Sequence, residues 1–229
     1  MEEKIEITPI ARIYNDFTDS FGIPKQGNLA PHLMSHIVME PEFKVAEAFR
    51  GIEEFDRIWL LWLFDAEDVK PWSPTVRPPV LGGNTRMGVF ATRSPNRKNH
   101  IGMTNVGLVS YEWDENDGPV LTVSGADLRS GTRIIDIKPY IRGVDSFPDA
   151  VSGFTDYVND SPLEVFFETD FPDDMSSDKR QALEEILSLN PRPRYHDDPM
   201  RVYGMNYGDY NVSFTADDEK IIVNSITKR

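Results

Sequence analysis

The sequence predicts a mainly β fold in which a β-barrel or β-sandwich domain is followed by a small α+β domain. Roughly the first 140 residues contain many short apolar stretches separated by turns rich in Gly and Pro, with few helical patterns. One clear helical pattern follows at residues 177–189, after a polar, turn-rich stretch at 143–162. We therefore divide the chain into a domain at 1–145, a connector at 146–162 and a domain at 163–229.

Strands are expected wherever a short apolar or alternating stretch is bounded by turn residues. Residues 55–64 are apolar almost throughout, which is typical of a strand buried on both faces, and a buried helix is the alternative. A short helix is expected at 41–49, and loops are expected at 21–31, 70–84 and 94–100. The other expected strands, with turns at 117–118 and 130–131, are 5–13, 86–92, 106–113, 120–124 and 134–137.

The second domain is expected to combine one helix with a few strands. Ala182, Leu183, Ile186 and Leu187 form one apolar stripe at helical spacing, and Asn190 before a proline ends the pattern. Strands are expected at 163–168, 211–215 and 221–226. This unit is too small for the sequence to establish that it folds independently.

Composition excludes several classes of protein. The chain has no cysteine, which excludes disulfides, thiolate nucleophiles and iron–sulfur clusters. Its longest apolar run, at 58–64, is far shorter than the ~20 residues of a membrane-spanning helix. The first residues, MEEKIEITPI, lack the basic start and apolar stretch of a signal peptide. We therefore expect a cytoplasmic protein.

The charge distribution is strongly uneven. The formal net charge is −14, which argues against a nucleic-acid-binding protein. Residues 69–111, however, contain no Asp or Glu and six Lys or Arg residues, so the rest of the chain carries −20. Clustered cations attract anionic ligands, and we predict an anion-binding surface in this segment. The alternative is a charge-poor stretch that packs as core strands.

The common catalytic motifs are absent from the chain. There is no G-x-G-x-x-G fingerprint, no P-loop and no G-x-S-x-G nucleophile elbow. His32 and His36 have the spacing of two metal ligands on a helix, but they lie in a loop-like context beside Pro31, and no metal site is predicted. The residues alone therefore indicate a small-molecule or phosphate site on a β domain.

Five sequence blocks resemble, in order, those of the TsaA-like family, the TrmO tRNA methyltransferases. The most specific block is RPPVLGGNTRMGVFATRSPNRKNHIG at residues 77–102. The resemblance covers nearly the whole chain. The other blocks are FGIPKQG at 21–27, GIEEFDRIWLLWLF at 51–64, GADLRSGTRIIDIKPY at 125–140, and LNPRPRYHDD at 189–198 followed by YGDYNVSF at 207–214.

The resemblance implies a β-barrel that binds S-adenosylmethionine and works as a homodimer. The implied reaction methylates the exocyclic nitrogen of threonylcarbamoyl-adenosine beside the anticodon of threonine tRNA. Two alternatives stay open. A methyltransferase of the same fold with a small-molecule acceptor would suit the net charge of −14, and a non-enzymatic S-adenosylmethionine-binding sensor would use the same pocket.

The resemblance also implies a set of cofactor-binding residues. Arg93 is expected to hold the methionine carboxylate, and Asp127 to bind ribose hydroxyls or the ammonium group. The alternative to cofactor binding is that Arg93 is only a surface cation and that residues 125–131 form only a turn. Asp65 and Ala66 occupy the place of a His-Gln pair in the family. The full implied set is Pro24, Lys25, Gln26, Asp65, Ala66, Arg93, Asp127, Leu128, Arg129 and Ser130.

Catalytic and RNA-binding residues are predicted from two further blocks. The acceptor nitrogen must lose a proton, and the DIKPY block offers Asp136, Lys138 and Tyr140 as partners. The alternative is that Asp136 and Lys138 form a structural pair on one strand. The loop at 97–102 lacks two prolines of the family, so we expect it to be more mobile or shaped for another acceptor. The residues expected to meet RNA phosphates are Arg77, Arg86, Arg97 and Lys98.

Overall fold

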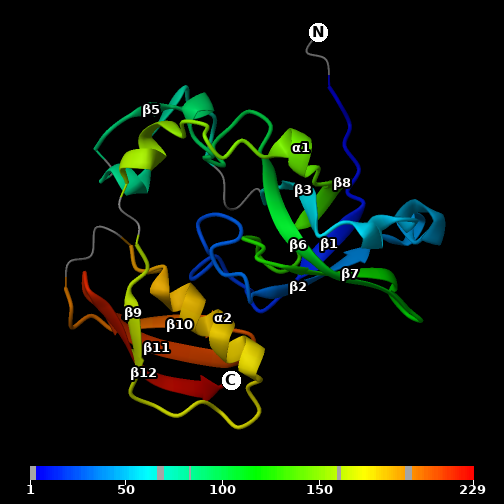
Figure 1. Cartoon of the computed structure of the whole chain (residues 1–229). Coiled ribbons are helices and arrows are strands. Elements are labelled where there is room, and N and C mark those ends of the chain that lie inside the picture. Colours follow the sequence, from blue (N-terminus) through cyan, green and yellow to red (C-terminus); the bar gives the residue numbers. More distant parts are fainter. Residues whose placement is uncertain (1–3, 66–69, 83, 159–160, 194–197) are drawn as a thin grey trace.

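The first unit of the computed structural model is a closed β-barrel (Figure 1). The structure describes the chain except residues 1–3, 66–69, 83, 159–160 and 194–197. Strands exceed helices, at 34% against 17%, and the prediction of a mainly β fold with a barrel is confirmed. The barrel strands, in the order β1-β2-β7-β6-β3-β8, are β1 (Ala11–Tyr14), β2 (Met34–Met39), β7 (Gly118–Ser124), β6 (Ile101–Asp114), β3 (Arg57–Leu63) and β8 (Arg133–Pro139).

Strand β3 shows how the barrel divides its faces. Ile58, Leu60 and Trp62 point to the core, while the residues between them are half-buried. The prediction of a strand is therefore confirmed, but burial of both faces is wrong, because a barrel strand has only one inner face. The outer face is partly covered by α1 (Arg142–Asp145), because Trp59 Nε1 donates a hydrogen bond to Oδ2 of Asp145 in this helix at 3.1 Å.

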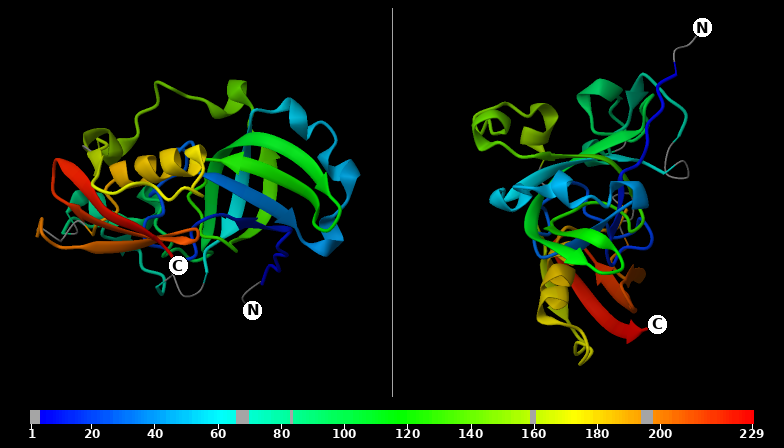
Figure 2. Two further views of the ribbon diagram at one scale, coloured as in Figure 1. Left: turned by 90° about the horizontal axis from the view of Figure 1, so that it is seen from below. Right: turned by 90° about the vertical axis from the view of Figure 1, so that its right-hand side faces the viewer.

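The second unit is a four-stranded sheet with one helix packed on it (Figure 2). Helix α2 (Ser177–Ser188) is capped by Ser176, whose Oγ accepts a hydrogen bond from the Lys179 amide, and the helix buries the predicted apolar stripe. The edge strand β9 runs parallel to β12, and the other pairs are antiparallel. The strands, in sheet order, are β10 (Tyr203–Tyr207), β11 (Tyr210–Ala216), β12 (Lys220–Lys228) and β9 (Glu164–Phe167).

Several predicted elements differ from the structure. The first strand begins only at Ala11, and residues 4–10 before it are not in a strand, although the Ile10 amide donates to the Ile134 carbonyl at 2.8 Å. The expected helix at 41–49 is two short 3-10 turns, Pro41–Phe43 and Ala46–Phe49. The expected strand at 86–92 is a two-residue strand, β5 (Met87–Gly88), followed by a 3-10 turn, Val89–Ala91. Strands β2 and β10 were not predicted.

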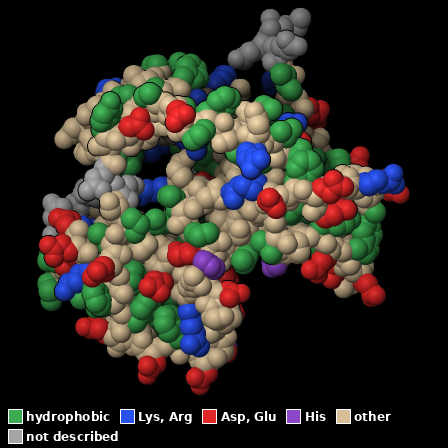
Figure 3. Space-filling model, viewed as in Figure 1, with side chains coloured by type: hydrophobic (Ala, Val, Ile, Leu, Met, Phe, Trp, Pro, Cys, Tyr) green, Lys and Arg blue, Asp and Glu red, His purple; other side chains and the backbone are tan. Residues whose placement is uncertain are grey.

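The remaining short elements are a two-stranded sheet and several 3-10 turns. Strand β5 pairs with β4 (Thr75–Val76). In the view of Figure 3 a hollow opens between the upper left of the molecule and the second unit, and Lys and Arg atoms are visible inside it. Asp and Glu side chains are spread over the outer face of the second unit in the same view. The other 3-10 turns are Ile52–Glu54, Pro79–Leu81 and Gly153–Tyr157.

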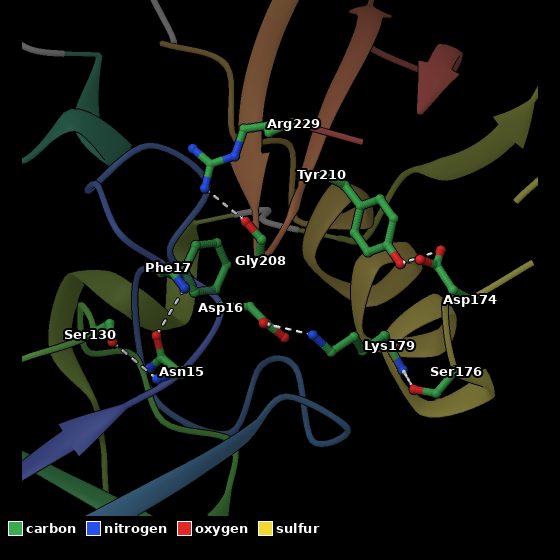
Figure 4. Close-up of polar contacts among 10 residues, drawn as sticks. All are labelled: Asn15, Asp16, Phe17, Ser130, Asp174, Ser176, Lys179, Gly208, Tyr210 and Arg229. Carbon is green, nitrogen blue, oxygen red and sulfur yellow. Dashed lines mark hydrogen bonds and ion pairs between the residues drawn. The ribbon is translucent and has the colours of Figure 1, made fainter. Parts of the chain in front are cut away.

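The connection between β1 and β2 joins the two units. Phe17, Ala30 and Leu33 are buried in the core of the second unit although they belong to the first part of the chain. Lys179 Nζ of α2 lies 2.8 Å from Asp16 Oδ1 (Figure 4). The division of the chain into two domains at 146–162 stays a prediction, because the core of the second unit also contains residues from the connection between β1 and β2.

The helices that the structure describes include none that is long and apolar enough to cross a membrane.

Replacement of Phe17 by Ala should destabilise both units together. Phe17 is fully buried, and its ring centroid lies 5.9 Å from that of Tyr207. We expect Phe17→Ala to lower the free energy of unfolding by about 3–5 kcal/mol, measured by urea denaturation with one probe in each unit. Met200→Ala, at a residue 81% exposed, is the control and should change stability by less than about 0.5 kcal/mol. Loss of the second unit alone would contradict the shared core.

Candidate functional site

A cavity of about 670 Å³ lies at one end of the barrel. It is bounded by the loop at 20–26, the end of β3, the stretch at 92–97, the start of β6 and the β7–β8 connection. Its size is within the ~300–1,000 Å³ range of small-molecule sites. The cavity brings together eight of the predicted cofactor residues: Pro24, Lys25, Gln26, Asp65, Arg93, Asp127, Leu128 and Arg129.

Asp127 is a partly buried carboxylate in this cavity. Thr104 Oγ1 donates a hydrogen bond to Asp127 Oδ1 at 2.7 Å. Burial raises the pKa of Asp127 above its ordinary value, while the hydrogen bond from Thr104, that from the Gly27 amide and the charge of Arg93 act in the opposite direction. The carboxylate is therefore placed to bind a cation or a hydrogen-bond donor in the cavity.

Arg93 supplies a positive charge to the same cavity. Its Nη1 donates to Gln26 Oε1 at 2.6 Å, and Gln26 Nε2 donates to the Lys25 carbonyl at 2.6 Å. The Arg93 side chain is exposed to solvent and its charge acts on Asp127. The cavity thus presents a guanidinium and a carboxylate together, which suits a ligand that carries both an anionic and a cationic or donor group.

Asp65 is engaged by two arginines of the protein. Arg129 Nη2 lies 2.5 Å from Asp65 Oδ2, and Arg133 Nη2 lies 3.7 Å from Asp65 Oδ1. Its charge is therefore largely matched within the site. Ala66, the other residue predicted there, is outside the residues that the structure describes.

Ser130 does not line the cavity that contains the other predicted residues. Its Oγ accepts a hydrogen bond from the Asn15 amide at 3.3 Å (Figure 4). Its own amide donates to the Phe17 carbonyl at 2.7 Å. These contacts hold the β7–β8 turn against the residues that follow β1. A cofactor contact by Ser130 stays a prediction, with no support from its position.

Aromatic side chains form one wall of the cavity, and sequence reasoning did not single them out. The Trp62 and Phe64 rings have centroids 4.2 Å apart. Gly102 pairs with Trp62 across β3 and β6, and a Cβ on Gly102 would lie 2.3 Å from the indole. The glycine thus gives the indole room to lie over the strand. The alternating pattern of β3 and the facing glycine were the available signal.

The predicted catalytic residues lie away from the cavity. Lys138 Nζ lies 2.7 Å from Asp136 Oδ2, and the Tyr140 ring packs near Trp59 with centroids 6.2 Å apart. The cavity includes Thr132, six residues before Lys138, which is roughly 20 Å along an extended strand. The geometry matches a structural pair of Asp136 and Lys138. A catalytic role for these residues stays a prediction that their position within one chain does not support.

The predicted RNA-binding residues have different environments. Arg97 Nη1 donates to the carbonyls of Val89 and Thr92 at 3.0 and 2.6 Å, and its guanidinium lies over the Phe90 ring. Arg97 therefore holds the 3-10 turn in place. The exposed members of the set are Arg77, Lys98 and Arg86, whose Nη1 also donates to Thr75 Oγ1 at 3.2 Å.

The loop at 97–102 is fixed by hydrogen bonds despite its lack of the family's prolines. His100 adopts a left-handed backbone with φ 38°, and its Nδ1 lies 2.9 Å from the Pro95 carbonyl. Its carbonyl accepts a hydrogen bond from the Phe64 amide at 2.9 Å. The mobility predicted for this loop stays a prediction, and these contacts argue for a defined shape.

The fold and the cavity define a β-barrel protein with a candidate site for a small molecule that carries opposite charges. Comparisons with known proteins give the family. The model of the tRNA-methyltransferase O N-terminal domain matches residues 12–146, and that of the TrmO C-terminal domain matches residues 160–229. The chain therefore belongs to the TrmO family.

Relatives and solved structures agree with this membership. A tRNA (adenine(37)-N6)-methyltransferase of Escherichia coli (strain K12) is 33% identical over 91% of this chain and 92% of its own length. A putative S-adenosylmethionine-dependent methyltransferase RcsF of Pseudomonas aeruginosa is 36% identical over 90% of each chain. The crystal structure of TrmO from P. aeruginosa superposes with a TM-score of 0.80 at 28% identity, covering 100% of this chain and 99% of that one.

Replacement of Gly102 by Ala should disturb the aromatic wall. The new Cβ would meet the Trp62 ring, whose position is fixed by the barrel core. We expect Gly102→Ala to lower the free energy of unfolding by about 1–3 kcal/mol in denaturant titrations. Gly88→Ala is the matched control, because nothing lies within 4 Å of a Cβ there. Equal stability of the two variants would show that the indole is not confined by Gly102.

Proposed function

We propose that this protein is an S-adenosylmethionine-dependent methyltransferase that modifies the exocyclic nitrogen of adenine 37 in tRNA. The observation that carries the proposal is the cavity in which Arg93, Gln26 and Asp127 meet. The similarity to the Escherichia coli protein, which is named a tRNA (adenine(37)-N6)-methyltransferase, also supports the proposal.

The residues of the cavity fit the chemistry of the cofactor. Arg93 would hold the methionine carboxylate, and Asp127 would accept from the ammonium group or the ribose hydroxyls. Trp62 and Phe64 offer aromatic faces, which attract a sulfonium more than a cationic side chain would. When bound, S-adenosylmethionine supplies an activated methyl group. The task of the chain is then to orient the donor and to exclude water.

The charge distribution supports a polyanionic acceptor. Residues 69–111 carry six cations and no acid, and Arg77, Arg86 and Lys98 are exposed there. We extend the proposal to threonylcarbamoyl-adenosine in threonine tRNA and to the cytoplasm, the expectations that the sequence resemblance carries. Arg97 is assigned to the fold of the 3-10 turn rather than to direct phosphate contact.

A homodimer is part of the proposal. The segment at 141–157 exposes several large apolar side chains, a feature of surfaces that contact other proteins. Asp136, Lys138 and Tyr140 are retained as catalytic candidates for such a dimer, in which β8 of one copy would have to approach the cavity of the other. The exposed apolar residues of the segment are Ile141, Val144, Phe147, Val151 and Tyr157.

Mass spectrometry of tRNA nucleosides tests the proposal against its alternatives. A strain that lacks the gene should lose the N6-methyl group from the modified adenosine of threonine tRNA, and the purified protein should restore it. A small-molecule methyltransferase, which the net charge of −14 favours, would leave tRNA unchanged. A sensor would bind S-adenosylmethionine without turnover in any extract fraction.

Arg93→Gln should weaken S-adenosylmethionine binding without unfolding the protein. The exposed guanidinium contributes little to packing, whereas a lost charged hydrogen bond costs about 1.5–3 kcal/mol, or roughly 10–100-fold in Kd. Isothermal titration calorimetry measures the loss. Arg50→Gln, at an exposed residue outside this cavity, is the control and should bind as the wild type does. If Arg93→Gln binds S-adenosylmethionine as tightly as the wild type does, Arg93 does not contact the cofactor.

Arg77→Gln combined with Arg86→Gln should weaken tRNA binding and its dependence on salt. Each phosphate contact contributes ~0.7–0.9 to the slope of log K against log salt. We therefore expect the slope to fall by up to about 2 in filter-binding assays, with the Kd of S-adenosylmethionine unchanged. Arg50→Gln serves again as the control. An unaltered slope would place the RNA elsewhere on the molecule.

A further inference from the structure

A chain of hydrogen bonds runs beneath the cavity and ends on Asp127. Trp62 Nε1 donates to Thr104 Oγ1 at 3.1 Å, and Thr104 Oγ1 donates to Asp127 Oδ1 at 2.7 Å. Trp62 lies on β3, Thr104 lies on β6 and Asp127 follows β7. The Trp62 and Thr104 side chains are buried, at 8% and 4% exposure. Water therefore has little access to the Thr104 hydroxyl, which lies between Trp62 and Asp127.

The direction of this chain is set by the indole. An indole N–H is a donor only, whereas a hydroxyl has one hydrogen to give. Since Thr104 receives the Trp62 hydrogen, its own hydrogen is directed to Asp127. If that carboxylate oxygen were protonated, the buried Thr104 hydrogen would lose the acceptor it has among the described residues, a loss that typically disfavours such a state.

We propose that Thr104 is a positioning residue that keeps Asp127 as an oriented hydrogen-bond acceptor for the donor groups of the cofactor. Those donors are the ribose hydroxyls or the α-ammonium group of S-adenosylmethionine, so the inference rests on the proposed function. Trp62 acts through Thr104, and Gly102 allows the indole to reach it.

Other groups around Asp127 act on the same carboxylate. Burial raises its pKa, and the Gly27 amide and the charge of Arg93 lower it together with Thr104. Lys25, Arg97, Arg129 and Asp65 also line the cavity, and Arg129 is paired with Asp65. Removal of the Thr104 hydroxyl should therefore move the pKa of Asp127 further up. As pH falls, the Asp127 carboxylate would then be lost at a higher pH than in the wild type.

Three variants separate this role from simple packing. Thr104→Val keeps the shape and removes the hydroxyl, Thr104→Ser keeps the hydroxyl, and Trp62→Phe removes only the N–H and part of the ring. Calorimetric titration with S-adenosylmethionine from pH 5 to pH 8 is the measurement. We expect Thr104→Val to bind about 10-fold more weakly near neutral pH and to lose affinity at a higher pH. Thr104→Ser should bind within about 3-fold of the wild type, and Trp62→Phe should lie between the two.

Two results would overturn the proposal. One is a Thr104→Val protein with the affinity and pH profile of the wild type. The other is a Thr104→Ser protein as impaired as Thr104→Val, which would assign Thr104 to packing through its methyl group. Melting temperatures of all variants identify a folding defect. If Thr104→Val does not fold, the comparison of Thr104→Ser with Trp62→Phe tests the proposal. A pH profile of Trp62→Phe that matches the wild type would then contradict the hydrogen-bonded series from Trp62 through Thr104 to Asp127.

A measurement without ligand distinguishes this inference from the proposed function. If the wild type does not bind S-adenosylmethionine, the proposed cofactor is wrong. Carbon-13 NMR titration of the Asp127 carboxyl in the ligand-free protein still tests Thr104. Its pKa should rise in Thr104→Val and return in Thr104→Ser, and an unchanged pKa in Thr104→Val would refute the positioning role.

Discussion

The pairing of β3 with β6 is the constraint on which the cavity depends. Its register places Trp62 opposite Gly102 and Leu60 opposite Thr104. A slip by one residue would turn each inward side chain of β3 outward, because side chains alternate along a strand. The indole would then leave both the cavity wall and the Thr104 hydroxyl. Burial of Ile58, Leu60 and Trp62 favours this register, because a slip would expose these apolar side chains to solvent.

The connection between β1 and β2 imposes a second constraint, since it serves both units. Asn15 Nδ2 donates to the Leu128 carbonyl beside Asp127, while Phe17, two residues later, is buried in the second core. Gly27 in the same connection packs closely on Thr104, where a Cβ would lie 2.6 Å from its methyl group. The second unit therefore contributes indirectly to the cavity, by fixing the connection that forms one of its walls.

The sequence predicted the elements whose burial follows a regular pattern and missed those whose pattern is broken. Strand β2 was overlooked because one of its inward residues is Ser35, which is buried and accepts from Asn15 Nδ2 at 3.3 Å. Strand β10 alternates Tyr203, Met205 and Tyr207 inward, but Gly204 and Asn206 between them resemble a turn. The helix expected at 41–49 is divided into two 3-10 turns because Val45 between them adopts an extended backbone, with φ −122° and ψ 111°.

The sequence predicted those residues of the candidate site whose chemical type and sequence block are informative without knowledge of their partners in the fold. Arg93 and Asp127 stand out within sequence blocks, and the fold brings them together. The alternating pattern of β3 could have indicated Trp62 as an inward side chain, but the hydrogen bonds that join Trp62, Thr104 and Asp127 connect different strands, and no linear pattern reveals them. Asp136, Lys138 and Tyr140 follow the cavity residues closely in sequence, but β8 is extended, so each residue moves them about 3.3 Å further from the cavity.

The acid-free segment at 69–111 has a narrower role than its charge alone indicates. Arg97 donates to the carbonyls of the turn at 89–92, and both Arg97 and Arg93 line the cavity, so these two cations act within one copy of the protein. Arg77, Arg86 and Lys98 remain exposed. The rest of the chain carries −20 and repels a polyanion over most of its surface. An acidic protein can therefore favour one orientation of an RNA by repulsion elsewhere, with few attractive contacts at the site itself.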